Sequence, residues 1–326
     1  MKSDEKDIDL QSAETGQAAG KWAEGMTTGF IPVDGGKVFY RMYGADRPGT
    51  PVIFIHGGPG CGCDYYYKQT PIGKDRPVVF YNQLGSAGSD IAEEYTRADQ
   101  VKKLFTVERF VEELDTVVKF FGFDNFVLCG HSWGTMLALE YAAAKHPGGL
   151  KGIIMAGPYL KTETWIEDAE RLIRTLPDGD HMWSVIQECD ASGIYTEEHS
   201  RIMEVYARNF YSRVPGAMDG TPEEPPTRVV DGVDVYTYMW GPADFSCTGI
   251  LKGRDSTPLL KEVQVPIMYL CGEYDNGSPE AAVYYRSMTI NGEICVLPGC
   301  AHDMTRERPE EFNAVVNAFA SRVGDR

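Results

Sequence analysis

The sequence contains no apolar run near the roughly 20 residues that a helix needs to cross a bilayer. Its opening stretch, MKSDEKDIDLQSAETGQAAG, is polar throughout, so we expect no standard signal peptide. Basic residues are also scarce: 31 Lys and Arg stand against 48 Asp and Glu, for a formal net charge of −17. Because phosphate backbones and anionic surfaces attract basic patches, this balance argues against nucleic acid or a membrane as a partner.

The eight cysteines include no CxxC pair and form no Cys/His cluster with zinc-ligand spacing, so we expect neither a metal nor a cofactor. Cys129 and Cys271 lie in apolar, strand-like runs, where buried free thiols are usual. The simplest interpretation is a cytoplasmic protein with reduced thiols. Cys61 and Cys63 flank a glycine beside a candidate active-site loop, and either could be reactive.

Strand-like and helix-like segments alternate over the first half of the chain. GFIPVDGGKVFYRMYG predicts two strands joined by a tight turn. PVIFIHGGPG and PVVFYNQLGSAGSD are apolar before they reach glycines, as buried parallel strands are. TVERFVEELDTVVKFFGF has helical spacing, and NFVLCG, MLALEYAAAKH and LKGIIMAGP continue as strand, helix and strand. This alternation predicts an open α/β sheet.

The alternation stops near residue 160 and later resumes. Residues 161–258 are helical and aromatic, whereas VPIMYLCGEYD and EICVLPGCAH again resemble sheet strands and PEEFNAVVNAFASRV a last helix. We therefore predict a core made of residues 26–160 and 259–326, a helical cap inserted at 161–258, and a mobile tail at 1–25.

The segment GHSWG fits the pattern G-x-S-x-G, with Ser132 at its centre. Between a strand and a helix, this pattern places the serine on a strained turn and needs small neighbours. The hydroxyl is then pushed above the sheet, and the backbone N–H of Trp133 points to where an oxyanion would form. A glycine-rich packing turn is the structural alternative. The strand before and the helix after favour a nucleophile.

A serine hydroxyl needs a base to act as a nucleophile. Of the six histidines, only His302, in LPGCAHDMTRERPEEF, follows a late strand, where this architecture places the base. The acid comes before it, and YLCGEYDNGSPE offers Asp275, with Glu273 as the alternative. Side-chain alternation and the following Asn-Gly turn favour Asp275, whose role would be to orient the imidazole.

A second oxyanion donor is expected in the loop after an early strand, and HGGPG occupies that place. Glycine lets the backbone approach a substrate closely. Gly58 is the preferred donor and Gly57 is possible, whereas His56 is expected to be structural.

HGGPG, FYNQLGSAGSD, GHSWGTMLALEYA, GEYD and PGCAH together resemble the proline iminopeptidases (prolyl aminopeptidases) and relatives such as the tricorn-interacting aminopeptidases and certain amino-acid amidases. The likeness runs from about residue 28 to 323 and includes YMWGPADFSCTGILKGRD. It implies an α/β-hydrolase fold with a helical cap. It also implies a serine hydrolase that releases an N-terminal amino acid from a peptide or amide with a free amine.

In that family, cap carboxylates recognise the free α-amino group of the substrate. The resemblance matches two positions of this chain to that role, Glu204 in RIMEVYARNF and Asp244 in GPADF. An ammonium group in a dry pocket needs carboxylate partners, so the assignment is chemically sensible. Four aromatic residues could form a wall of such a pocket or could equally belong to the core: Tyr65, Tyr66, Trp133 and Trp240.

The sequence also departs from the family. An acid usually stands where this chain has Asn82, and Glu is more common than Asp at position 244. FYSRVPGAMDG replaces the family's usual end of the cap helix. These departures leave open an ester, lactone or specialised-metabolite hydrolase, or an acyltransferase, with the same triad. A non-catalytic binding protein on this fold is disfavoured by the complete triad. Side-chain preference and oligomeric state are not specified.

Overall fold

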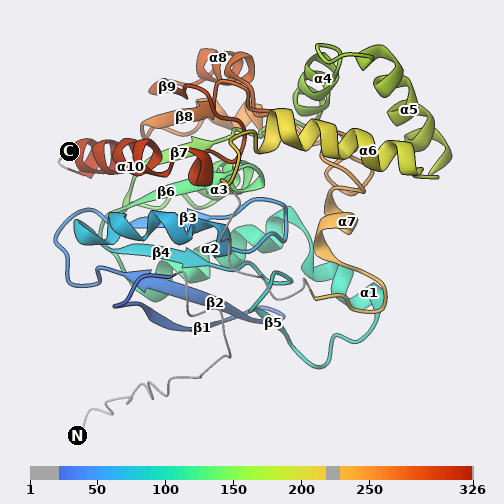
Figure 1. Ribbon diagram of the computed structural model, residues 1–326. Helices are drawn as coiled ribbons and strands as arrows, with labels where there is room; N and C mark the ends of the chain where they lie inside the picture. The colour runs from blue at the N-terminus through green and yellow to red at the C-terminus, as the bar shows by residue number, and fades with distance from the viewer. Residues whose placement is uncertain (1–21, 218–227, 325–326) are drawn as a thin grey trace, which may run out of the picture.

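A computed structural model describes residues 22–217 and 228–324 (Figure 1). The predicted tail at 1–25 lies mostly outside the described residues. Its last part, however, begins with Trp22, whose ring packs 5.6 Å from that of Phe80 and whose indole N–H donates to Asp64 at 3.2 Å. Among the described residues, no helix is both long and apolar enough to cross a membrane.

The described strands form a single sheet in the order β1-β2-β4-β3-β6-β7-β8-β9, with β5 beside β2. β1 and β2 pair antiparallel through the predicted tight turn, β4 and β5 run antiparallel to β2, and the pairs from β4 to β9 are parallel. The strands are β1 (Thr27–Val33), β2 (Gly36–Tyr43), β3 (Val52–Ile55), β4 (Val78–Tyr81), β5 (Asp90–Ile91), β6 (Phe126–His131), β7 (Leu150–Ala156), β8 (Ile267–Gly272) and β9 (Gly292–Leu297).

Helices cover both faces of this sheet, which explains why β3, β4, β6 and β8 are buried at every residue (Figure 1). One apolar cluster lies under α2, α3 and α8, and the other under α10 and the 3-10 helix η1. The bounds are η1 (Asp64–Lys74), α1 (Ala98–Val101), η2 (Lys102–Leu104), α2 (Val107–Phe121), α3 (Trp133–Lys145), η4 (Thr257–Lys261), α8 (Pro279–Ser287), α9 (Met304–Glu307) and α10 (Pro309–Gly324).

Local chemistry sets the ends of α2, which was predicted from its apolar spacing. The hydroxyl of Thr106 accepts a hydrogen bond from the N–H of Arg109, three residues on, and so caps the first turn. Gly122 ends the helix in the left-handed conformation, at φ 60°. The predicted helix is therefore confirmed, and Gly122 sets its end.

Between β7 and β8 the chain leaves the sheet and forms a helical layer beside the carboxyl ends of the strands (Figure 1). Its apolar core contains Trp183, Ile202, Tyr206 and Phe245, separate from the two clusters of the sheet. The helical elements of this cap are α4 (Thr162–Ile173), α5 (Gly179–Ser192), α6 (Glu197–Tyr206), the π-helix η3 (Ala207–Tyr211) and α7 (Val235–Met239). Much of the Pro/Glu-rich stretch DGTPEEPPTRVVDG lies outside the described residues.

Candidate active site

Ser132 lies at the turn between β6 and α3 with φ 54° and ψ −122°, a strained backbone for a residue with a side chain. The two flanking glycines, Gly130 and Gly134, have no room for a side chain. A Cβ on Gly130 would collide with the carbonyl of Gly134, and one on Gly134 would collide with that of Ile55. The turn is therefore the strained strand-to-helix elbow that the sequence predicts, and it places Ser132 at the start of a helix, where backbone N–H groups lack helical partners.

His302 and Asp275 form a buried pair close to this turn. The Nδ1–H of His302 donates to Oδ1 of Asp275 at 2.7 Å, and their side chains are 2% and 0% exposed. The same carboxylate accepts the N–H of Gly277 at 2.7 Å, which fixes its orientation. Glu273, the alternative acid, is exposed and instead accepts the N–H of Gly299 at 2.8 Å. The geometry therefore favours Asp275 over Glu273 as the partner of the imidazole.

The surroundings of His302 make its imidazole a stronger base. Burial lowers the pKa of His302, but the charge and hydrogen bond of Asp275, helped by the charges of Asp244 and Asp303, outweigh burial and raise that pKa above its ordinary value. The adjacent His131 behaves oppositely, because burial and the charge of His302 hold its pKa well below the usual range. Nε2 of His131 lies 3.0 Å from the backbone carbonyl of His302, so His131 supports that backbone as a neutral donor.

The HGGPG loop presents one backbone donor beside Ser132. The N–H of Gly57 is already bound to the hydroxyl of Tyr65 at 2.9 Å. Gly58 has φ 106°, in the region that favours glycine, and lines the same cavity as Ser132. Of the two predicted donors, the geometry therefore favours Gly58 over Gly57.

Gln83 connects the HGGPG loop to the serine turn. Its side-chain N–H donates to the carbonyl of His56 at 3.0 Å, and its Oε1 accepts the indole N–H of Trp133 at 2.9 Å. The backbone N–H of Gln83 donates to Nε2 of His56 at 2.9 Å, and burial lowers the pKa of that histidine to about 4. His56 is thus a neutral structural residue, as predicted. Asn82 supports the same region by accepting the N–H of Cys63 at 2.7 Å.

Two small hollows adjoin Ser132, and five residues line both: Gly58, Ser132, Trp165, Tyr236 and Asp244. One hollow, of about 40 Å³, is further lined by Gly57, Cys61, Tyr65, His131, Tyr211 and His302. The other, of about 20 Å³, is further lined by Tyr159 and Trp240. The candidate nucleophile, the base and one cap carboxylate therefore meet at a single site with aromatic walls.

Asp244 is held at this site by the aromatic residues of the cap. Its Oδ1 accepts the hydroxyl of Tyr236 at 2.6 Å, and its backbone carbonyl accepts the indole N–H of Trp165 at 2.9 Å. The side chain of Trp165 also packs edge-on to the ring of His302, with centroids 5.4 Å apart. Asp244 is thus held in the same hollow as His302, and its role in binding an amine stays a prediction.

The structure does not bring Glu204 to this site. Its side chain is 67% exposed and pairs with Arg208 one turn later, at 3.3 Å. The buried face of α6 is formed by His199, Ile202 and Tyr206, so position 204 falls on the opposite, solvent-facing side. Helical register therefore directs the Glu204 carboxylate into solvent.

The aromatic candidates divide between the cavity and the core. Tyr65 and Trp240 line the hollows, whereas Tyr66 and the indole of Trp133 are buried outside their linings. Sequence reasoning missed three cavity-lining cap residues, which are Trp165, Tyr211 and Tyr236. The last of these lies just ahead of the GPADF motif, and only its proximity to that motif could have indicated a role.

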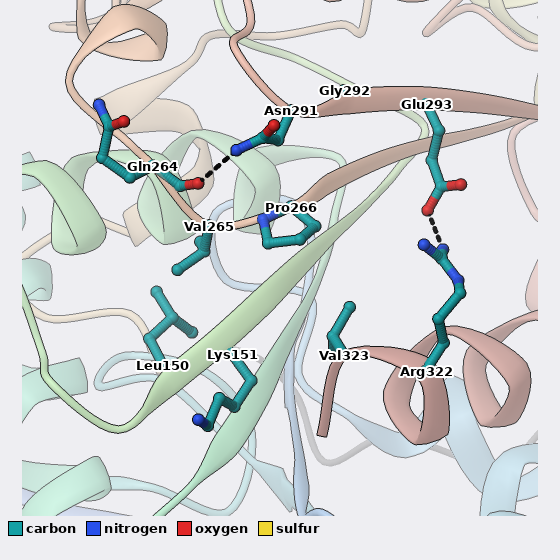
Figure 2. A pocket seen from close by; sticks show the side chains of 10 residues that line it. All are labelled: Leu150, Lys151, Gln264, Val265, Pro266, Asn291, Gly292, Glu293, Arg322 and Val323. Carbon is teal, nitrogen blue, oxygen red and sulfur yellow. Dashed lines mark hydrogen bonds and ion pairs between the residues drawn. The ribbon is translucent and has the colours of Figure 1, made fainter. Parts of the chain in front are cut away.

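A larger hollow, of about 450 Å³, lies elsewhere (Figure 2). It is formed where β7, β8 and β9 begin and where α10 ends, and Figure 2 shows Arg322 paired with Glu293 at its edge. Ligand sites in parallel sheets gather at the carboxyl ends of the strands, which is the opposite edge. None of the predicted site residues lines this hollow, and its size therefore does not mark the active site.

Comparison with known proteins supports this assignment of the fold and family. Residues 52–315 match the model of the alpha/beta hydrolase family. A proline iminopeptidase of Heyndrickxia coagulans is 36% identical over 298 residues, which cover 91% of this chain and 99% of that protein. A proline iminopeptidase of Lactobacillus delbrueckii subsp. lactis is 29% identical, over 85% of this chain and 92% of its own.

Solved structures give the same result. VinJ superposes with a TM-score of 0.78 at 28% identity, covering 91% of this chain and 99% of its own. A proline iminopeptidase of Mycobacterium smegmatis superposes with a TM-score of 0.76 at 24% identity, covering 91% and 98%, which bears on the fold alone. With its elbow serine, buried His–Asp pair and capped parallel sheet, the chain belongs to the proline iminopeptidase family of α/β-hydrolases.

Proposed function

We propose that the protein is a serine aminopeptidase that removes an N-terminal residue with a free amine from a short peptide or an amide. The observation that carries the proposal is that Ser132, His302 and the cap carboxylate Asp244 line one small cavity. The names of the full-length relatives support proline as the released residue. None of the eight cysteines, all of which lie among the described residues, forms a disulfide, which supports a reducing compartment such as the cytoplasm.

In the proposed reaction, Oγ of Ser132 attacks the scissile carbonyl carbon while Nε2 of His302 takes the hydroxyl proton. The negative oxygen of the tetrahedral intermediate accepts the N–H groups of Gly58 and Trp133. His302 then gives its proton to the leaving amine, the C–N bond breaks, and an ester to Ser132 remains. Water attacks this ester by the same route and releases the free amino acid. Asp275 keeps Nδ1 protonated, so that Nε2 is free to accept.

Asp244 would bind the ammonium group of the substrate. A carboxylate in a cavity with aromatic walls favours a cation over a neutral group, because little water is present there to solvate the charged groups instead. The rings of Trp165, Tyr236 and Trp240 would contact the apolar side of the N-terminal residue. A compact pyrrolidine ring suits a hollow of this small size better than a long side chain.

Ester or lactone hydrolysis is the second candidate, and one observation favours it. Only one carboxylate of the cap, Asp244, lines the described cavity, because Glu204 points into solvent. A site with one carboxylate is expected to bind the amine less tightly than a site with two.

The experiment that tests the proposal is a substrate panel with the wild-type protein and Ser132→Ala. The panel contains proline amide, proline anilide, their N-acetylated forms and a simple ester. We expect turnover of the free-amine substrates, little turnover of the acetylated forms, and none with Ser132→Ala. Equal turnover of free and acetylated substrates would refute the amine-binding role. Turnover that survives in Ser132→Ala would refute the triad.

A further inference from the structure

A segment of the cap is hydrogen-bonded directly to the loop that carries the catalytic histidine. We call residues 207–214, the π-helix η3 and the three residues after it, the strap, and residues 298–303 the histidine loop. The N–H of His302 donates to the carbonyl of Phe210 at 3.2 Å, and the N–H of Asp303 donates to that of Tyr211 at 2.8 Å. The backbone position of His302 therefore depends on where the cap strap lies.

Glu307 ties the two segments together through its side chain. Its Oε1 accepts the N–H of Val214 at 2.7 Å and also the N–H of Arg213, both in the strap. Its Oε2 accepts the N–H of Ala301 at 2.5 Å, in the histidine loop. One buried carboxylate thus receives three backbone donors, two from the cap and one from the residue before the catalytic histidine.

The contact between the strap and the histidine loop also places a cap side chain against the imidazole of His302. The ring of Tyr211, in the strap, lies 5.3 Å from that of His302, and both line the cavity beside Ser132. A shift of the strap would therefore move both the wall of the cavity and the backbone that carries the base. The proposed reaction assigns Glu307 no chemical step. Its three hydrogen bonds to the strap and the histidine loop are therefore the evident role of its buried carboxylate.

We propose that Glu307 is a positioning residue that aligns His302 with Ser132 by holding the histidine loop to the cap strap. The inference rests on the proposed role of His302 as the base. Glutamine at this position has nearly the same shape, but one end of its amide is a donor. That end would face a backbone N–H, so at least one of the three hydrogen bonds must be lost.

The test compares Glu307→Gln with Glu311→Gln, a control at an exposed acid on the neighbouring helix. The rate constant for labelling of Ser132 by an alkyl fluorophosphonate measures activation of the serine without any need for amine recognition. In Glu307→Gln we expect this rate and kcat for proline amide to fall about 10- to 100-fold, since small misplacements of catalytic groups cost about this much. KM should change less than kcat, because Asp244, the proposed partner of the amine, is untouched. Glu311→Gln should match the wild type.

A wild-type labelling rate in Glu307→Gln would overturn the proposal, even if the variant unfolds at a lower temperature. If that variant does not fold, Glu307→Asp decides the matter. It keeps the charge but shortens the reach, so slower labelling supports the proposal and an unchanged rate refutes it. A wild type that is labelled but does not cleave proline amide would refute the aminopeptidase function alone. A wild type that is not labelled would refute both proposals.

Discussion

The sheet core and the cap contribute to the candidate active site in different ways. Ser132, Asp275 and His302 follow β6, β8 and β9, respectively. Because these strands are parallel, their carboxyl ends lie at one edge of the sheet, and the three residues come together there. The cap contributes Asp244 and aromatic walls from separate helices and loops. Short local patterns therefore indicate the candidate catalytic residues of the core. The cap residues that line the cavity are brought there by packing, and apart from Asp244 in GPADF no motif indicates them.

The largest effect is expected in the core. Ser132→Ala removes the nucleophile, and loss of a triad nucleophile lowers kcat by about 10⁴- to 10⁶-fold. Steady-state turnover of proline anilide checks this, with a thermal melt to show that the fold is retained. Activity within tenfold of the wild type would place the chemistry on another residue.

A somewhat smaller loss is expected from Asp275→Asn, which keeps the shape of the acid. Asparagine can donate to Nδ1 and hold the wrong tautomer of His302, which costs about 10³- to 10⁴-fold in kcat. The pH profile gives a second readout. His302 must be neutral to act as a base, so wild-type kcat/KM should fall as pH drops through a pKa raised above about 6.5. Without the Asp275 charge that pKa falls, and the acid limb should move to lower pH. An unmoved limb would contradict the assignment.

In the cap, Asp244→Asn should mainly affect binding. Loss of a charged partner for an ammonium group raises KM for free-amine substrates by about 10- to 100-fold, and kcat should change less. Parallel kinetics with a neutral ester supply the control, because its KM should not change. An equal rise for both substrates would show that Asp244 supports the fold of the pocket rather than binding the amine.

The smallest effect is expected at the other cap carboxylate. Glu204→Gln breaks only an exposed pair with Arg208, and such pairs contribute about 0.3–0.5 kcal/mol. KM for proline amide and the melting temperature should both stay close to wild-type values. A tenfold rise in KM would mean that α6 turns inward when substrate binds.

Much of the core could be predicted because its evidence is local. The glycines beside Ser132 are forced by backbone contacts within the elbow and with β3. Asp275 lies in the turn region that follows the end of β8 at Gly272, just before the Asn-Gly pair. The order of serine, acid and histidine then follows from the order of the strands. The structure brings Ser132 and His302 to one hollow and pairs His302 with Asp275, while their catalytic roles stay predictions.

The cap was harder to predict because helical register is decided by packing. Glu204 was placed by resemblance, but the apolar stripe of α6 at His199, Ile202 and Tyr206 turns it outward. Trp165 and Tyr211 reach the cavity only through the tertiary arrangement of α4 and η3 beside the histidine loop. No spacing in the sequence shows that arrangement, nor the contact from Glu307 to the strap.

The most direct test of the division between core and cap is the ratio of kcat/KM for proline amide to that for N-acetylproline amide. It is measured in the wild type and in Asp244→Asn. We predict a ratio of about 100 or more in the wild type, and a collapse toward one in the variant while turnover of a neutral ester persists. A wild-type ratio near one, or a large ratio that survives the loss of Asp244, would contradict selection of the substrate by this cap carboxylate.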